Sequence, residues 1–209
     1  MDGQGISVAH HVPGAAREQP VFYFDLASPE AYLAAERVAG VLGVVPEWQP
    51  VLARDLPGGE LEAWRCASER EVYMGEVERR AAARGLQPLR WPPGWPAQGD
   101  LAMRVATYAK QIGRVVAFSL AAFRQAFAAG RDLSGEEGVV IAAAACEMHP
   151  VAVLKGAELR SVREGLARAG AAAAAAGVRS VPAVRAGDHV FHGDAELGRA
   201  AAELAKAAR

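Results

Sequence analysis

Hydrophobic and polar positions along the chain first predict a strand, a helix and a second strand. The run Val21 to Leu26 is short, apolar and aromatic, which is typical of a buried strand. Ser28-Pro29-Glu30 follows with a capping hydroxyl, a proline at the first helical position and an acid in the first turn. These signals predict a helix from Pro29 to about Leu42.

A second strand is predicted directly after this helix. Gly43 is a typical helix terminator, and Val44 to Leu52 returns to an apolar, strand-like pattern. Pro50 has no N–H to donate to a neighbouring strand, so it indicates an edge position. The first quarter of the chain is therefore a strand-helix-strand unit.

The middle of the chain is helical in its hydrophobic period, from Pro57 to about Leu159. Gly85, Gly130, Pro150 and the proline-rich run Trp91 to Pro96 interrupt it. The predicted helices lie near 60–85, 100–113, 115–129, 135–147 and 150–156.

The last part of the chain alternates between the two structure types again. A helix over Arg160 to Ala176 precedes a strand at Val181 to Val184, and Gly187-Asp188 is a typical two-residue hairpin turn. The returning strand is His189 to His192, and a helix follows over Ala195 to Ala208. The sequence thus predicts a flexible leader (1–19), an α/β domain in two pieces (20–56 and 160–209) and a helical insertion (57–159).

Composition and charge narrow the class of protein. Hydrophobic residues make up 52% of the 209 positions, enough for a sizeable core, and the formal net charge is -1. A near-neutral chain has no global field to attract nucleic acid or an anionic membrane. No apolar run is long enough to span a bilayer, and the first residues lack the pattern of a signal peptide. We therefore expect a cytoplasmic protein that binds neither nucleic acid nor a membrane.

Cysteine spacing and known motifs exclude several chemistries. Cys66 and Cys146 belong to no CxxC pair and no Cys/His cluster, so neither a metal site nor a local redox pair is expected. The phosphate loop, the dinucleotide fingerprint and the zinc-protease and serine-hydrolase motifs are also absent from the sequence.

The order of elements, with Pro182 at the start of the third strand, resembles a thioredoxin-like α/β fold with an all-helical insertion, the arrangement of the DsbA family. More narrowly, FYFDLASPEAYLA (Phe22 to Ala34) is similar to the opening of 2-hydroxychromene-2-carboxylate isomerases and kappa-class glutathione transferases. GVRSVPAVRAGDHVFHGDAEL (Gly177 to Leu197) resembles the second signature of these proteins.

The resemblance implies a thiol-dependent reaction at Ser28. DsbA-type oxidoreductases carry Cys-Pro-x-Cys where this chain has Ser28-Pro29-Glu30-Ala31, so the two thiols of dithiol exchange are missing. In the isomerase and kappa branches a serine at the first position holds the thiolate of glutathione, which makes Ser28 the expected catalytic residue. The alternative is that Ser28 is only a helix N-cap.

The same resemblance implies the binding residues for the cofactor. Val181 would precede a cis Pro182 and pair its backbone with the cysteinyl part of glutathione; the alternative is a trans proline that opens an ordinary strand. Asp194 would reach the γ-glutamyl ammonium, or else act only as a helix N-cap. The family has Asp and Arg where this chain has Ala195 and Glu196.

The insertion contributes the other candidate site residues. Pro92 to Arg104 is similar to a proline-rich turn of the family, with Gln98 placed to keep an amide near the sulfur. Trp91 and Trp95 would wall an aromatic substrate pocket, or else pack in the core. Glu30 would face the same pocket, where its charge opposes a thiolate.

These features predict an isomerase that uses glutathione or another low-molecular-weight thiol on small conjugated or aromatic substrates, in the manner of 2-hydroxychromene-2-carboxylate isomerases. The alternatives are a kappa-type glutathione S-transferase and a non-catalytic DsbA-like protein that binds a ligand or partner. A homodimer is compatible with either enzyme.

Overall fold

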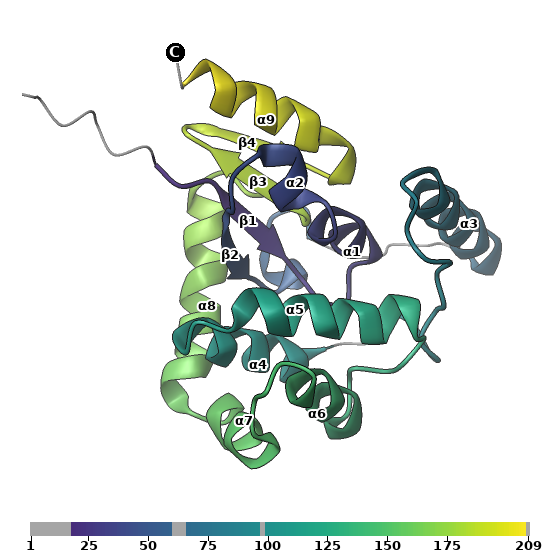
Figure 1. Ribbon diagram of the computed structural model, residues 1–209, viewed down its shortest axis with the longest axis vertical. Coiled ribbons are helices and arrows are strands. Elements are labelled where there is room, and N and C mark those ends of the chain that lie inside the picture. Colours follow the sequence, from purple (N-terminus) through teal and green to yellow (C-terminus); the bar gives the residue numbers. More distant parts are fainter. Residues whose placement is uncertain (1–17, 60–65, 97–98, 208–209) are drawn as a thin grey trace, which may run out of the picture.

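The computed structural model describes residues 18–59, 66–96 and 99–207, so nearly all of the predicted leader lies outside it. Strands and helices follow one another in the predicted order (Figure 1). The strands are β1 (Val21–Phe24), β2 (Glu47–Pro50), β3 (Ala183–Ala186) and β4 (His189–His192). The α-helices are α1 (Pro29–Ala35), α2 (Val38–Leu42), α3 (Ala67–Ala83), α4 (Asp100–Gln111), α5 (Val115–Phe123), α6 (Glu136–Ala144), α7 (Pro150–Ala157), α8 (Arg160–Ala175) and α9 (Leu197–Lys206). Shorter helical segments are η1 (Ala53–Asp55), η2 (Arg124–Ala128) and η3 (Asp194–Glu196).

The four strands form one mixed sheet in the order β2-β1-β3-β4. β2 runs parallel to β1, whereas β3 is antiparallel to both β1 and β4. Phe22 of β1 lies opposite Trp48 on one side and Val184 on the other. The edge position that Pro50 indicated for β2 is confirmed.

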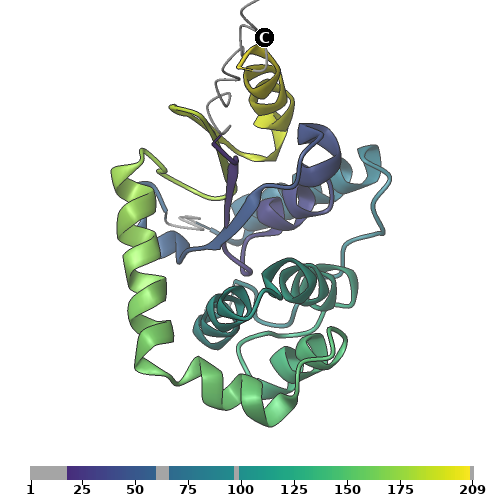
Figure 2. The same ribbon diagram turned by 60° about the vertical axis from the view of Figure 1, so that its left-hand side comes forward.

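Both faces of the sheet are covered by helices, which explains why β1 has no charged residue and is buried along its whole length. Phe22 and Phe24 belong to one buried cluster together with Leu197 of α9. Val21 and Tyr23 belong to a second cluster, which Ala173 of α8 completes. Figure 2 shows α8 and α9 on opposite sides of the sheet. Alternate side chains of one strand therefore enter two different cores.

The helices α4 to α7 form a group at one end of the sheet. α4 contacts α5, α7, α8 and β2, and α5 contacts α6. Figure 1 shows α4 to α7 as a group, while α3 lies apart from them beside α1. The insertion thus meets the first strand-helix unit along two surfaces.

The first helix differs from the prediction because it is broken after Ala35. The single helix predicted from Pro29 to about Leu42 is divided into α1 and α2. Arg37 leaves the helical region at φ -126°, and its N–H bonds to Ala34 O at 3.0 Å, one residue closer than in an α-helix. The break redirects α2, which packs against α9. No glycine or proline lies at residues 36–37, so the sequence carries no local signal for the break.

Two strand predictions differ from the structure at their ends: Val44 to Leu52 is too long on both sides of β2, and Val181 to Val184 begins and ends two residues before β3. Val44 and Val45 are 48% and 62% exposed and precede β2, so only Glu47–Pro50 is paired. β3 begins at Ala183, after the Val181-Pro182 turn. The β-branched valines at 44, 45 and 181 have a high strand propensity, but they lie outside the segments that are paired with a neighbouring strand.

Candidate functional site

Ser28 lies at the carboxyl end of β1, where the chain turns into α1. Its backbone is extended, and its Oγ accepts a hydrogen bond from Ala31 N at 3.1 Å. The residue is 2% exposed, and Pro29 occupies the first helical turn. The predicted N-cap is therefore present. No acceptor for the Ser28 hydroxyl hydrogen is found in the part of the chain that the structure describes, so this O–H can donate to a ligand.

Ser28 and Val181 line one pocket of about 180 Å³. The Val181-Pro182 peptide bond is cis. Within residues 18–59, 66–96 and 99–207, the backbone N–H and C=O of Val181 have no hydrogen-bond partner. Buried backbone groups are rarely left unpaired. The remaining lining residues are Pro29, Glu30, Ala53, Gly58, Gly59, Tyr73 and Ser180.

Three hydrogen bonds hold the turn that carries Val181. Arg179 N donates to Nε2 of His192 at 3.0 Å, and Gly58 N donates to Arg179 O at 2.7 Å. Gly193 N donates to Pro182 O at 2.8 Å. Burial lowers the pKa of His192, and the charge of Arg179 acts in the same direction. A neutral imidazole is therefore favoured, as the acceptor role requires.

The loop that contains Gly58 and Gly59 lies so close to neighbouring backbone that a side chain at Gly59 would not fit. A Cβ built at Gly59 would lie 1.5 Å from Ala53 O, and one at Gly58 would lie 3.2 Å from Arg179 O. Both glycines line the pocket. At these two positions the pocket wall is therefore backbone without a side chain.

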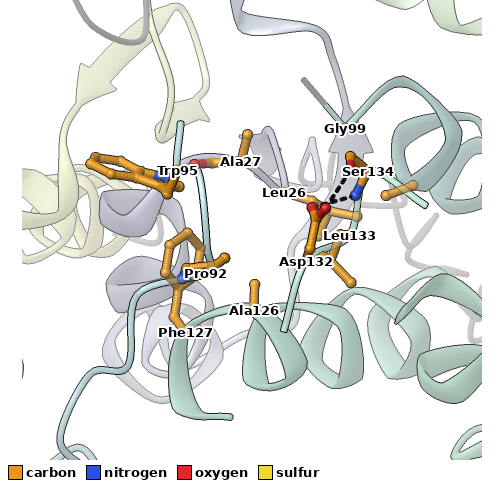
Figure 3. A pocket seen from close by; sticks show the side chains of 11 residues that line it. Leu26, Ala27, Pro92, Trp95, Gly99, Ala126, Phe127, Asp132, Leu133 and Ser134 are labelled. Atoms are coloured by element: carbon orange, nitrogen blue, oxygen red, sulfur yellow. Dashed lines mark hydrogen bonds between the residues drawn. The ribbon is translucent and has the colours of Figure 1, made fainter. Parts of the chain in front are cut away.

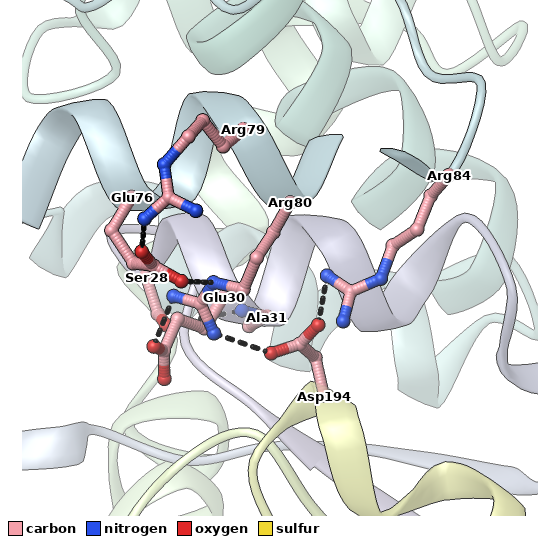
Figure 4. A network of polar contacts seen from close by, with 8 residues as sticks. All are labelled: Ser28, Glu30, Ala31, Glu76, Arg79, Arg80, Arg84 and Asp194. Carbon is pink, nitrogen blue, oxygen red and sulfur yellow. Dashed lines mark hydrogen bonds and ion pairs between the residues drawn. The ribbon is translucent and has the colours of Figure 1, made fainter. Parts of the chain in front are cut away.

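Glu30, the acid two residues after Ser28, belongs to a charged cluster at the edge of the pocket (Figure 4). Arg80 Nη2 donates to Glu30 Oε1 at 2.6 Å, and its Nη1 donates to Asp194 Oδ1 at 2.9 Å. Arg84 forms an ion pair with the other oxygen of Asp194. Asp194 is 1% exposed, so two guanidinium groups compensate a fully buried carboxylate.

The cluster corrects one interpretation of Asp194. Gly193 precedes the short segment η3, and the structure has no side-chain capping bond at the start of η3 or of α9. Asp194 is therefore not a helix N-cap, because its carboxylate faces Arg80 and Arg84 instead. The predicted contact with a ligand ammonium stays a prediction. Gln98 lies outside the described residues.

The predicted aromatic wall is arranged differently from the expectation. Trp95 is 2% exposed, and its Nε1 donates to Ala27 O at 3.1 Å. It lines a separate apolar cavity of about 20 Å³, shown in Figure 3, together with Leu26, Ala27 and Phe127. Trp91 packs on Trp95 at 4.4 Å between ring centroids. The two tryptophans support the Ser28 loop from behind, since neither lines its pocket.

Tyr73 is an aromatic residue that lines the Ser28 pocket, and sequence reasoning missed it. It lies on α3 and stacks on Trp95 with 6.1 Å between centroids and 4° between planes. Tyr73, Val77 and Arg80 repeat at a spacing of three and four residues, so they share one face of α3. This spacing was the available signal, but the structure was needed to show that the face is partly buried, with Val77 in the core.

Asp25 was also missed, although it directly follows the strand-like run. It is 4% exposed, and its two oxygens accept from Ala27 N at 3.0 Å and Ala53 N at 2.9 Å. Burial raises the pKa of Asp25, whereas the two backbone donors act in the opposite direction. Asp25 thereby ties the Ser28 turn to the Ala53 segment of the pocket wall.

Neither free cysteine lies in this pocket. Cys66 is exposed at the start of α3, and Cys146 is buried. Across the described ranges, no group of three or more His, Cys, Asp and Glu side chains is placed to hold a metal ion. None of the described helices is long and apolar enough to cross a membrane.

The sheet, its helical insertion and a site next to a cis proline define a thioredoxin-like protein. The family described as DSBA-like thioredoxin domain matches residues 21–205, and the chain belongs to this family. The fold predicted from the order of elements is thereby confirmed. No curated protein sequence matches the chain significantly.

Several solved structures share this fold. A 2-hydroxychromene-2-carboxylate isomerase superposes with a TM-score of 0.79 at 20% identity and covers 92% of this chain and 97% of its own. A probable DsbA oxidoreductase from Streptomyces coelicolor gives a TM-score of 0.73 at 20% identity, with 90% and 89% covered. The cytosolic disulfide reductase DsbM from Pseudomonas aeruginosa gives 0.63 at 12% identity, with 91% and 97% covered. At these identities the likeness establishes the fold alone.

Proposed function

We propose that this protein is a thiol-dependent isomerase of small conjugated substrates. The observation that carries the proposal is one pocket lined by Ser28 and by Val181, whose backbone has no partner among the described residues, at a position where the chain has no cysteine. Dithiol exchange requires two protein thiols, and residues 28–31 supply none. The reactive sulfur must then arrive with a ligand.

The pocket has groups that could bind both the backbone and the sulfur of such a ligand. In the described part of the chain nothing occupies the N–H and C=O of Val181, so they could pair antiparallel with the cysteinyl backbone of glutathione or of a similar thiol. Ser28 would donate its O–H to the sulfur and stabilise the thiolate. At about 180 Å³ the pocket is smaller than the roughly 300–1000 Å³ of typical ligand pockets, so a small electrophile fits best.

The proposed reaction is an addition followed by an elimination. The thiolate adds to the β-carbon of a double bond conjugated with a carbonyl, a C–S bond forms, and the electron pair moves to the carbonyl oxygen as an enolate. The former double bond is now single and rotates. The enolate then re-forms the double bond and expels the thiolate, so no electrons are gained or lost overall. A reducing compartment such as the cytoplasm keeps the thiol available.

The identity of the thiol is the first thing to measure. Asp194 is paired with Arg80 and Arg84, so the γ-glutamyl ammonium of glutathione would have to share this carboxylate with two guanidinium groups. Thermal unfolding should therefore be compared with glutathione, cysteine and S-methylglutathione, because a ligand of the native state raises the apparent stability. We expect a free thiol to stabilise the protein more than its S-methylated form.

Turnover is then tested with a cis/trans-isomerisable 2-hydroxyaryl substrate in the presence of that thiol. Ser28→Ala should lower the rate about tenfold to a thousandfold, the range for loss of one donor to an anion. Ser161→Ala on α8, an exposed helical serine, is the matched control. A stable 1:1 adduct without isomerisation indicates the transferase alternative. Absence of both thiol binding and turnover would leave the non-catalytic alternative.

A further inference from the structure

Arg80 is the one side chain that contacts both Glu30 and Asp194 within the described residues. It lies on α3 in the insertion, Glu30 lies at the start of α1, and Asp194 lies in η3 next to the last helix. Figure 4 shows its guanidinium between the two carboxylates. A single residue therefore joins three segments that are far apart in the sequence.

The burial of these groups makes the contacts energetically important. The side chains of Arg80 and Glu30 are 24% and 28% exposed, and that of Asp194 is 1% exposed. Partly buried charges interact more strongly than charges in water, and removal of one partner leaves the other uncompensated. Arg80 also faces Glu76 at 3.9 Å and the Tyr73 side chain, while Arg84 faces Asp194 from the same helix.

The position of Glu30 connects this cluster with the pocket. Glu30 forms part of the pocket wall together with Ser28 and Tyr73. An uncompensated carboxylate at this place would repel an anionic sulfur. Arg80 offsets that charge, and its helix also carries Tyr73, which forms another part of the same wall.

We propose that Arg80 is a positioning residue of the Ser28 pocket, which neutralises Glu30 and fixes α3 against α1 and η3 so that the pocket accepts an anionic ligand. The proposal rests on the proposed function only in taking this ligand to be a thiolate. It explains why an acid is tolerated next to Ser28: Glu30 and Arg80 act as one neutral pair.

The experiment places a thiol in the pocket covalently, so that it does not depend on glutathione binding. Ser28→Cys is made in a background of Cys66→Ser and Cys146→Ala, which leaves one thiol in the chain. The pKa of this thiol is measured from the ultraviolet absorbance of the thiolate and from the pH dependence of its alkylation by iodoacetamide.

In this background, Arg80→Gln should raise the pKa of the introduced thiol by about one unit, because the charge of Glu30 is then unopposed. Adding Glu30→Gln to Arg80→Gln should return the pKa to its starting value. Arg79→Gln is the matched control. Arg79 is next to Arg80 in sequence, but it pairs with Glu76 and its side chain is 74% exposed, so its loss should not change the thiol pKa.

Two outcomes overturn the proposal. One is an unchanged pKa in Arg80→Gln, and the other is a rise that Glu30→Gln fails to reverse, which would show a structural effect alone. If Arg80→Gln does not fold, as judged by thermal unfolding, the single variant Glu30→Gln in the Ser28→Cys background tests the proposal. It leaves the charge of Arg80 unopposed and should lower the thiol pKa, and no change would contradict the proposal. Failure of the isomerase assay affects none of these measurements.

Discussion

Asp25 and Asp194 are both buried carboxylates next to the Ser28 pocket, but different groups compensate them. Asp25 accepts two backbone N–H groups, from Ala27 and Ala53. Asp194 faces the guanidinium groups of Arg80 and Arg84. Burial raises the pKa of Asp25 in spite of its donors, so that carboxyl resists ionisation. Asp25 thus ties its own turn to the Ala53 segment through backbone N–H groups, whereas Asp194 is joined to α3 through the full charges of two arginines.

The largest effect is expected for Asp194→Asn. Two partly buried guanidinium groups lose the anion between them, and we expect the free energy of unfolding to fall by about 3 kcal/mol. Denaturant unfolding measures this loss. Glu196→Gln is the control, because its ion pair with Arg199 is exposed and should contribute less than about 1 kcal/mol. Equal losses in the two variants would contradict the role of the cluster.

Asp25→Asn should have a smaller effect and so sharpen the comparison. The neutral side chain avoids the burial of a charge, but it retains one acceptor oxygen for two backbone donors. We expect a loss of about 2 kcal/mol in the same denaturant experiment, from one unsatisfied buried N–H. A loss larger than that of Asp194→Asn would show that Asp25 carries a compensated charge instead.

Ser28→Ala should lower stability by about 1 kcal/mol, the usual cost of losing a helix N-cap. The loss should be smaller than for either aspartate, because the hydroxyl pairs with a single N–H of the same turn. Chemical unfolding of Ser28→Ala and Ser161→Ala measures it. If Ser28→Ala were as stable as wild type while isomerisation was lost, the hydroxyl would act on the ligand and contribute nothing as a cap.

The smallest expected effect is a pH dependence due to His192. Its pKa is lowered by burial and then by Arg179, so the unfolded chain takes up a proton near 6.5 and the folded chain only at lower pH. The stability from neutral His192 is complete above about 6.5 and is lost as the pH falls toward the folded pKa. His192→Gln keeps an acceptor for Arg179 N and should remove this slope. Melting temperatures of the two proteins between neutral and mildly acidic pH test it, and parallel curves would refute the role of His192.

Local signals were enough to predict the helix cap at Ser28 and the elements around it. The apolar run of β1, the Ser28-Pro29 helix start and the Gly187-Asp188 hairpin are all short-range patterns, and the structure has each of them. Tyr73 and Asp25 were missed for a different reason. Nothing near them in sequence shows that α3 lies against α1 or that Asp25 reaches Ala53, 28 residues away.

By itself, the sequence determined the order of strands and helices, the cap at Ser28 and the absence of a thiol pair, because these depend on neighbouring residues or on residue type alone. Only the tertiary structure decided that Glu30 is neutralised by Arg80, that Asp194 pairs with two arginines instead of capping a helix, and that Trp95 lies behind the pocket. The physical reason is that charge compensation and burial depend on which distant segments meet, and no local propensity encodes those contacts.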